Sequence, residues 1–501
     1  MSILGDPINL NGIIGNDGNS LPTICLTQEP LVLGGENWGT TIGPNLAEKW
    51  ETSKDGKTWT FYLRKDVKWQ DGKQFTADDV LFTIQSIQDS KLQTGFRERF
   101  MESGKPIKFE KVDDYTIKAN LTQPNSGFLT AIVVPVIPKV LEGQDLNKSA
   151  FNQKPVPGLG PFKFIEWKSG ESITLEANPN YYRGAPNFDK WVIRIIPNQD
   201  AAVVALQAGE IDFAQIRGKD VPKFLGNPNY TVKNNSVDLM RGIVVNHAKP
   251  FFQDVRVRQA MSMAIDRQAV IDSAEQGFGV PMDSIFNQPV SIYKAGKFQP
   301  PKQDFAKAKA LMAGAGWVDT NGDGIVEKDG KPFKINFEYS PGWTWIAPST
   351  ALIQQWWKQI GIDVTVRMYD SASFIPKVFY STELDKPYDV FFNGWGMFGS
   401  DPDHYANYFA STTQGANPLN YENKQVKDLF LKARITVDDK ERAALYEQAE
   451  KLLWDDVALI PIYYPQRIFA WNNRVVIDPD LIDTSRFPPF KSPEKLYMRP
   501  K

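Results

Sequence analysis

The alternation of strand-like and helix-like segments limits the fold of this chain more than any other feature of its sequence. Strand-like runs at 334–340, 363–369 and 388–395 lie between segments whose apolar residues recur at helical spacing. These helical segments are 255–274, 304–316, 349–361 and 439–456. Strands and helices that alternate along a chain favour the α/β class with mixed, largely parallel sheets flanked by helices, and we expect that class here.

The sequence of the N-terminal half also predicts strands and helices that follow one another. Trp59, Phe61 and Leu63 recur at every second position, so one face of a strand there is expected to be buried. Thr76 is expected to cap a helix, because acidic residues follow it in the first turn and an apolar stripe continues beyond them. A second unit is expected over 158–216, with a hairpin, a strand, a helix and a further strand.

Length and composition exclude several classes of protein. A chain of 501 residues is expected to form about three domains at roughly 150 residues each. Because 57 basic residues oppose 59 acidic ones, the net charge of −2 gives no global attraction to nucleic acid or to an anionic membrane. The only cysteine, Cys25, excludes an intrachain disulfide and is expected to be a buried thiol.

We expect neither a membrane span nor a secretory signal within the given sequence. No apolar run reaches the roughly 18 residues that a membrane span needs. The first residues lack the charged and apolar segments of a secretory signal. We therefore expect either a cytosolic protein or a mature form from which the signal has been removed.

Catalytic motifs are scarce. His247 and His404 are the only histidines, and the nucleophile, zinc-protease and nucleotide-binding motifs are all missing. Asp401 and Asp403 supply two carboxylates, but residues two apart cannot flank a sugar from opposite sides. We expect no catalytic residues, and a hydrolase is the less favoured alternative.

Four long blocks carry a resemblance to a known family. They are 46–84, 158–212, 251–271 and 388–411, and the run from Asp439 to Trp471 also fits. In this order they resemble the large solute-binding proteins that serve ABC importers, family 5, the oligopeptide- and dipeptide-binding type. The resemblance extends over essentially the whole chain.

This resemblance implies a two-lobed periplasmic-binding-protein-like fold of type II, with a ligand cleft between the lobes. Lobe I would comprise 1–35, 157–248 and 468–501, an extra domain 36–156, and lobe II 249–467. Ligand would stabilise a closed state that a membrane permease can recognise. The resemblance also implies a monomer that acts in the periplasm or tethered by lipid outside the cytoplasmic membrane, which favours a signal that has been removed.

The ligand is expected to contact the segment around Trp395, which matches a tryptophan of the family's cleft and is flanked by Gly394 and Gly396. Peptide-binding members carry an aspartate three positions later, where it holds the peptide ammonium, but this chain has Phe398. A buried ammonium without a charged partner costs several kcal/mol, so a free peptide amino terminus is a poor guest there. Asp401 or Glu29 could substitute for the missing aspartate.

The chain differs from the peptide-binding members of the family in a second segment, residues 339–358. Dipeptide-binding members carry arginines near this segment, whereas this chain has none and has Trp343 and Trp345 instead. With Trp395 and Trp38, these indoles could stack on the flat faces of sugar rings, as in oligosaccharide-binding members. We therefore expect an oligosaccharide ligand, with a short peptide as the alternative and other solutes less favoured; two histidines disfavour a nickel role.

One loop resembles the start of a calcium-binding turn. Asp319, Asn321 and Asp323 stand at alternate positions, and Glu327 could add a further ligand in place of Gly330 at the twelfth position. The alternative is an ordinary Asp- and Gly-rich turn of a hairpin. No other cofactor is expected.

Overall fold

The computed structural model describes residues 1–15, 17–34, 42–102, 104–236, 239–286, 296–340, 345–369, 388–396, 401–410, 417, 419–478, 481–482 and 489–499. The chain divides into two compact units. Unit 1 comprises residues 1–235 and 467–501, and unit 2 comprises residues 236–466. The chain therefore passes between the units twice. A further division of unit 1 into lobe I and an extra domain over 36–156 stays a prediction.

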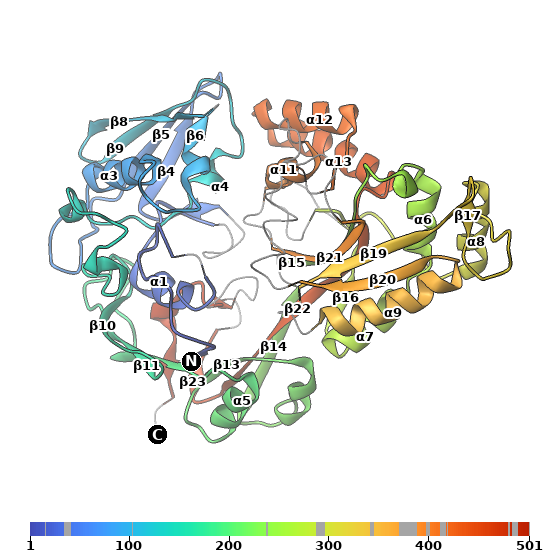
Figure 1. Ribbon diagram of the computed structural model, residues 1–501. Coiled ribbons are helices and arrows are strands. Elements are labelled where there is room, and N and C mark those ends of the chain that lie inside the picture. Colours follow the sequence, from blue (N-terminus) through green and yellow to red (C-terminus); the bar gives the residue numbers. More distant parts are fainter. Residues whose placement is uncertain are drawn as a thin grey trace. The chain divides into compact units, whose positions relative to one another are not determined.

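The structure confirms the strand and the helix that were expected in the N-terminal part of the chain. The strand belongs to a four-stranded sheet of unit 1. Its order is β4 (Ala47–Thr52), β5 (Thr58–Leu63), β9 (Thr116–Asn120) and β8 (Lys108–Asp113), and every pairing is antiparallel. The apolar positions of β5 are buried. Helix α3 (Ala77–Gln88) lies against this sheet, and its Asp79 carboxylate accepts the Thr76 N–H at 3.0 Å (Figure 1).

The second sheet of unit 1 has the order β1 (Ser2–Ile3), β12 (Lys190–Ile195), β11 (Ser172–Ala177) and β10 (Phe162–Lys168). After β12 the chain forms α5 (Gln199–Gln207) and β13 (Phe213–Ile216). Strand β13 pairs with the last residues of β22 (Ile460–Asn472), with Phe213 opposite Trp471. The C-terminal segment of the chain therefore completes the core of unit 1.

Unit 2 is built on a sheet in which β15 (Leu239–Val245) lies between β22 and β21 (Val390–Gly396). Beyond β21 follow β19 (Lys334–Tyr339) and β20 (Asp363–Met368). Figure 1 shows α7 (Arg267–Glu275) and α9 (Ile346–Gln359) side by side along this sheet. Helices α12 (Lys424–Ile435) and α13 (Asp439–Asp455) pack against each other elsewhere in the unit.

The expected class is confirmed, but the expected strand direction is wrong for most pairings. Among the strands that the structure describes, parallel pairing is found for β1 with β12 and for β19 with β20 and β21. The other pairings are antiparallel. Some join strands connected by a short hairpin, as between β10 and β11, and others join strands far apart in sequence, as β15 with β21 and β22. The sheets are mixed, and only a minority of their pairings are parallel.

The single helix expected over 255–274 is also wrong. The segment forms α6 (Val255–Met263) and α7, separated at Asp266. The Asp266 carboxylate caps α7 by accepting the Ala269 N–H at 3.0 Å. Arg267 is buried, and its Nε donates to the Pro461 carbonyl at 2.8 Å, which anchors the start of α7 to β22.

The remaining elements are short. They are α1 (Leu21–Thr27), β2 (Val32–Leu33), β3 (Gly43–Pro44), β6 (Met101–Glu102), β7 (Lys105–Pro106), α4 (Phe128–Ala131), β14 (Tyr230–Ser236), β16 (Gly279–Pro281), α8 (Phe305–Gly314), β17 (Glu327–Lys328), β18 (Lys331–Pro332), α11 (Ala406–Phe409), β23 (Val475–Val476) and β24 (Tyr497–Met498). Of these, α8 lies within the segment expected to be helical, 304–316, and begins one residue after its start.

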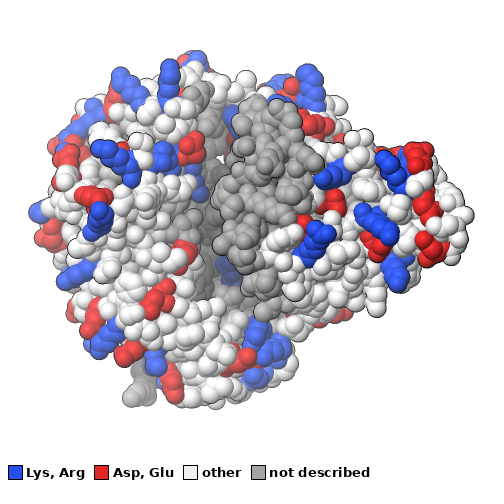
Figure 2. All heavy atoms as spheres, in the orientation of Figure 1, with Lys and Arg blue, Asp and Glu red and all other residues white. Residues whose placement is uncertain are grey.

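Buried apolar residues form two clusters in each unit. Cys25 is buried in one cluster of unit 1, as expected. Within the described ranges, no helix combines the length and apolar character needed to cross a bilayer. Figure 2 shows basic and acidic side chains intermingled on the visible face of the molecule, in keeping with the near-neutral charge.

Candidate functional site

The structure describes three predicted ligand residues, Trp345, Asp401 and Glu29, with their side chains, and the others less completely or not at all. Trp38, Trp343 and Phe398 lie outside the described residues. For 394–396 the structure gives the strand and its register: Gly394 lies opposite Arg241, Trp395 opposite Met240 and Gly396 opposite Leu239 on β15. The predicted tryptophan therefore stands near the end of a strand that has neighbours on both sides. Its contact with a ligand stays a prediction.

Trp345 immediately precedes α9 and is buried, with 7% of its surface exposed. The guanidinium carbon of Arg241 lies 4.1 Å from the centre of its ring. Phe392 approaches the same indole edge-on at 5.0 Å. A cation over an indole is a favourable contact, so a sugar could stack on that face only by displacing Arg241. The proposed stacking role of Trp345 stays a prediction.

Arg241 belongs to a polar group that the sequence analysis missed. Tyr463, opposite Arg241 on β22, donates from its hydroxyl to Glu275 at 3.0 Å. Burial raises the pKa of Glu275, and the nearby positive charge of Arg241 opposes that rise. The sequence contains one feature that could have predicted this group: an arginine inside the otherwise largely apolar run Leu239–Val245. This group places a cation beside an indole within unit 2.

Asp401 is engaged inside unit 2. Its carboxylate accepts the Asp403 N–H at 2.9 Å and lies 2.6 Å from Nη2 of Arg442, which donates to it. The two side chains are 5% and 2% exposed. Burial opposes the charge of Arg442, but the neighbouring Asp401 carboxylate outweighs it and the pKa of Arg442 is raised. A ligand ammonium would have to compete with this guanidinium.

A second ion pair extends the Asp401 cluster. Arg434 on α12 donates from Nε to the Asp403 carboxylate at 2.9 Å. Tyr446 on α13 donates to the other Asp403 oxygen at 3.1 Å. The cluster therefore contains two carboxylates and two guanidinium groups, and its charges balance.

Glu29 is buried in unit 1, shortly after α1, with 2% of its surface exposed. Its carboxylate accepts hydrogen bonds from Asn45 at 2.8 Å, from the Tyr181 hydroxyl and from Arg183 at 3.3 Å. Burial, followed by the charge of Glu29, raises the pKa of Tyr181 well above its ordinary value. Binding of a ligand ammonium by Glu29 stays a prediction, because a guanidinium already contacts this carboxylate.

A second acid faces the same arginine. Glu494 is 3% exposed, and its Oε1 lies 4.0 Å from Nε of Arg183. Neither carboxylate oxygen of Glu494 has a hydrogen-bond partner among the described residues. Burial raises the pKa of Glu494, and Arg183 opposes that rise. The Glu29 cluster thus has two carboxylates around one guanidinium.

The predicted calcium loop is compact. Asp319, Asp323 and Glu327 bring one carboxylate oxygen each within 4.8 Å of one another. Polar groups of the loop also form hydrogen bonds with one another. Asp319 accepts the N–H groups of Gly322 and Gly324, and Asn321 donates to Glu327 at 2.7 Å. These hydrogen bonds fit the turn of a hairpin equally well. Calcium binding by Asp319, Asn321, Asp323 and Glu327 stays a prediction.

Comparisons with known proteins identify relatives along the whole chain. The family model described as bacterial extracellular solute-binding proteins, family 5 middle, matches residues 41–417. The oligopeptide-binding protein AppA of Bacillus subtilis (strain 168) is 30% identical over 476 residues, which cover 93% of this chain and 86% of that protein.

Solved structures give the same result. The crystal structure of the ABC transporter substrate-binding protein CtaP from Listeria monocytogenes has a TM-score of 0.86 at 30% identity, over 99% of this chain and 98% of that one. The structure of AppA from Bacillus subtilis in complex with a nonapeptide has a TM-score of 0.78 at 27% identity, over 100% of this chain and 98% of that one.

Proposed function

Because this chain belongs to the bacterial extracellular solute-binding proteins of family 5, we propose that it captures oligopeptides and delivers them to the permease of an ABC importer. The observation that carries the proposal is the similarity to AppA, an oligopeptide-binding protein whose structure with a nonapeptide matches this chain over its full length. The protein acts outside the cytoplasmic membrane, in the periplasm or tethered by lipid, and as a monomer.

A peptide ligand replaces the oligosaccharide that the sequence analysis favoured. That hypothesis depends on exposed indole faces, and the one described indole among its residues, Trp345, already has Arg241 over its ring. The relatives named above bind an oligopeptide, a nonapeptide or the substrate of an ABC transporter. The peptide alternative therefore has the better support.

The proposed activity is binding without chemistry. A solute-binding protein needs a ligand-dependent shift between conformations, which requires only that the ligand contacts one state better than the other. Burial lowers the pKa of His247 to about 3, and its Nε2 lies 2.9 Å from the Ala458 carbonyl. His247 is therefore neutral and structural.

Calorimetry with a panel of peptides and sugars tests this proposal. Tri-, penta- and nonapeptides are titrated in parallel with maltopentaose and cellopentaose. We expect micromolar or tighter binding of at least the longer peptides and no heat from the sugars. Sugar binding with silent peptides would overturn the peptide proposal and restore the oligosaccharide hypothesis, and turnover of any of these compounds would overturn the binding-protein proposal.

A pair of tryptophan variants adds residue-level resolution. Trp395→Ala is expected to weaken peptide binding at least tenfold, because aromatic side chains at binding sites contribute that much when truncated. Trp50→Ala, on a half-buried position of β4, serves as the control and should bind peptide as the unchanged protein does. Equal affinities for both variants would remove Trp395 from the site.

A further inference from the structure

Unit 1 contains a cavity of about 440 Å³ lined mainly by aromatic and aliphatic side chains. Five rings contribute to the lining: Phe188, Trp191, Phe213, Trp471 and Phe490. Cavities that bind small molecules have volumes of roughly 300–1,000 Å³, and their walls are predominantly apolar. This cavity has the size and the lining of such a site.

The aromatic wall is assembled from distant parts of the chain and is braced internally. Trp191 lies on β12, Phe213 on β13 and Trp471 on β22. Phe490 contacts two of these rings, with centroids 5.4 Å from Trp191 and 4.8 Å from Phe213. All of these residues belong to unit 1. Because each ring is held by its neighbours, the wall is preformed.

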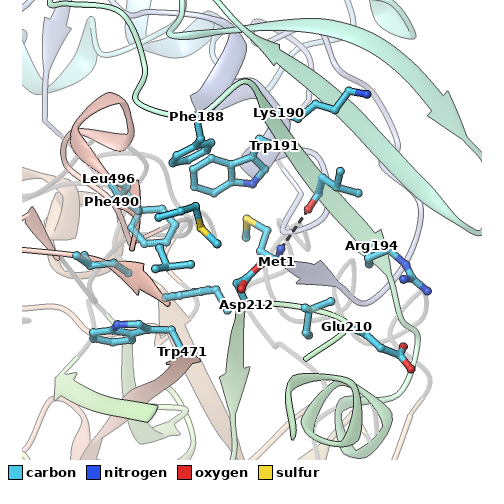
Figure 3. A pocket seen from close by; sticks show the side chains of 16 residues that line it. Met1, Phe188, Lys190, Trp191, Arg194, Glu210, Asp212, Trp471, Phe490 and Leu496 are labelled. Atoms are coloured by element: carbon cyan, nitrogen blue, oxygen red, sulfur yellow. Dashed lines mark hydrogen bonds between the residues drawn. The ribbon is translucent and has the colours of Figure 1, made fainter. Parts of the chain in front are cut away.

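One polar group in this wall has no partner. Trp191 is 7% exposed, and its indole N–H makes no hydrogen bond to any described residue. Figure 3 shows the indole beside Phe188, with its nitrogen on the side that faces Met1, whose own nitrogen donates to the Val192 carbonyl. Buried N–H groups are nearly always paired in native proteins, so this donor calls for an acceptor.

Four side chains that line the cavity are charged. Lys190 and Arg194 on β12 and Glu210 are exposed, and Asp212 is half-buried. Asp212 is already paired with Arg474. Because the wall itself is apolar, desolvating a charged ligand here would be unfavourable.

We propose that this cavity binds a small, uncharged, planar aromatic molecule with one hydrogen-bond acceptor, which receives the Trp191 indole N–H. The rings supply an apolar surface for the ligand plane, and the indole fixes its orientation. Its lining includes none of the residues predicted to bind the ligand, so it is a second binding site in addition to the proposed peptide capture.

Two probes of nearly equal shape test the proposal by equilibrium dialysis at pH 8, where both are uncharged. Isoquinoline carries a ring nitrogen that accepts a hydrogen bond, and naphthalene does not. We expect one site per chain, with isoquinoline bound about tenfold more tightly because one hydrogen bond contributes that factor. Absence of binding by both probes, or equal affinities for them, would overturn the proposal.

Matched variants locate the acceptor's partner. Trp191→Phe keeps the aromatic ring and removes the N–H, so isoquinoline should weaken about tenfold, to the level of naphthalene, while naphthalene changes less than twofold. Trp59→Phe is the control, because the Trp59 indole N–H is also buried and unpaired among the described residues but lies in another core cluster of unit 1. A loss shared equally by both probes in Trp191→Phe contradicts the hydrogen bond.

A further variant tests the cavity itself without touching the buried wall. Met498 lines the cavity from β24 and is 43% exposed, so Met498→Trp is tolerated sterically and narrows the space. Both probes should then bind at least tenfold more weakly. Unchanged binding of both probes places them elsewhere and overturns the proposal.

Discussion

The Asp401 cluster of unit 2 and the Glu29 cluster of unit 1 use the same chemistry with different charge balance. In unit 2, Asp401 and Asp403 face Arg442 and Arg434, so each carboxylate has its own guanidinium. In unit 1, Glu29 and Glu494 share Arg183. Each cluster contains a buried carboxylate, Asp401 or Glu29, but only the second has more negative than positive groups among those named.

This difference shows why a buried carboxylate is a poor indicator of a ligand site. Asp401 and Glu29 are both suitable by residue type to hold an ammonium, and both already contact an internal arginine. What distinguishes the clusters is the number of charges around each guanidinium, which sets their response to mutation and to pH.

The largest effect is expected from Arg442→Met. Removing this guanidinium breaks its buried ion pair with Asp401, which should lower the free energy of unfolding by about 3–5 kcal/mol in urea denaturation. Arg434→Met is the matched control, because the Arg434–Asp403 pair is more exposed, at 34% and 17%, and should lose about 1 kcal/mol. Equal losses for the two variants would contradict the importance of burial at Asp401.

Arg183→Met should cost less, about 2–3 kcal/mol, because its side chain keeps 25% of its surface exposed. Two carboxylates then remain without a guanidinium, so the double variant Arg183→Met with Glu494→Gln should recover part of the loss. Urea denaturation of the single and double variants measures the coupling. Additive losses would show that Glu494 does not interact with the Arg183 charge.

Glu494→Gln should produce a smaller, pH-dependent effect. Because folding raises the pKa of Glu494, its contribution to stability is complete below the ordinary glutamate pKa of about 4.3 and is lost as pH rises through the folded pKa. The glutamine of the variant does not ionise, so the variant does not lose stability in this way. Its free energy of unfolding relative to that of the unchanged protein should therefore increase between pH 4 and pH 7. Glu176→Gln, at an exposed position of β11, is the control and should show no such trend.

The smallest effect is expected from acetylation of the peptide amino terminus. Since arginines already contact Glu29 and Asp401, we expect that neither carboxylate needs a peptide ammonium as its charged partner. A nonapeptide and its N-acetyl form should therefore bind within twofold of each other by calorimetry. A tenfold loss on acetylation would mean that a carboxylate of this protein does hold the amino terminus.

Local patterns predicted local structure well. The alternation at Trp59, Phe61 and Leu63 correctly indicated β5, and Thr76 with the acids that follow it correctly indicated the start of α3. The break between α6 and α7 was missed because apolar spacing continues through Asp266, whose capping role competes with the periodicity. Strand direction was missed because it depends on how strands are connected, which spacing does not report.

The candidate site was harder to predict because its partners are far apart in sequence. Arg442 lies 41 residues from Asp401, and Arg183 lies 154 residues from Glu29. Neither arginine belongs to a motif, so only the folded chain shows that these carboxylates are engaged. The orphaned indole of Trp191 is a similar case, since the residue types around it in sequence do not reveal which donor lacks an acceptor.

The return of the chain into unit 1 through β22 has a consequence for the order of folding. Phe213 and Trp191, in the first half of the sequence, pack with Phe469 and Phe490 from its last 35 residues. During synthesis or translocation from the amino end, this core stays incomplete until almost the entire polypeptide has emerged. Contacts between residues so far apart in sequence form slowly. Unit 2 can therefore fold before β22 and the residues after it complete this core of unit 1.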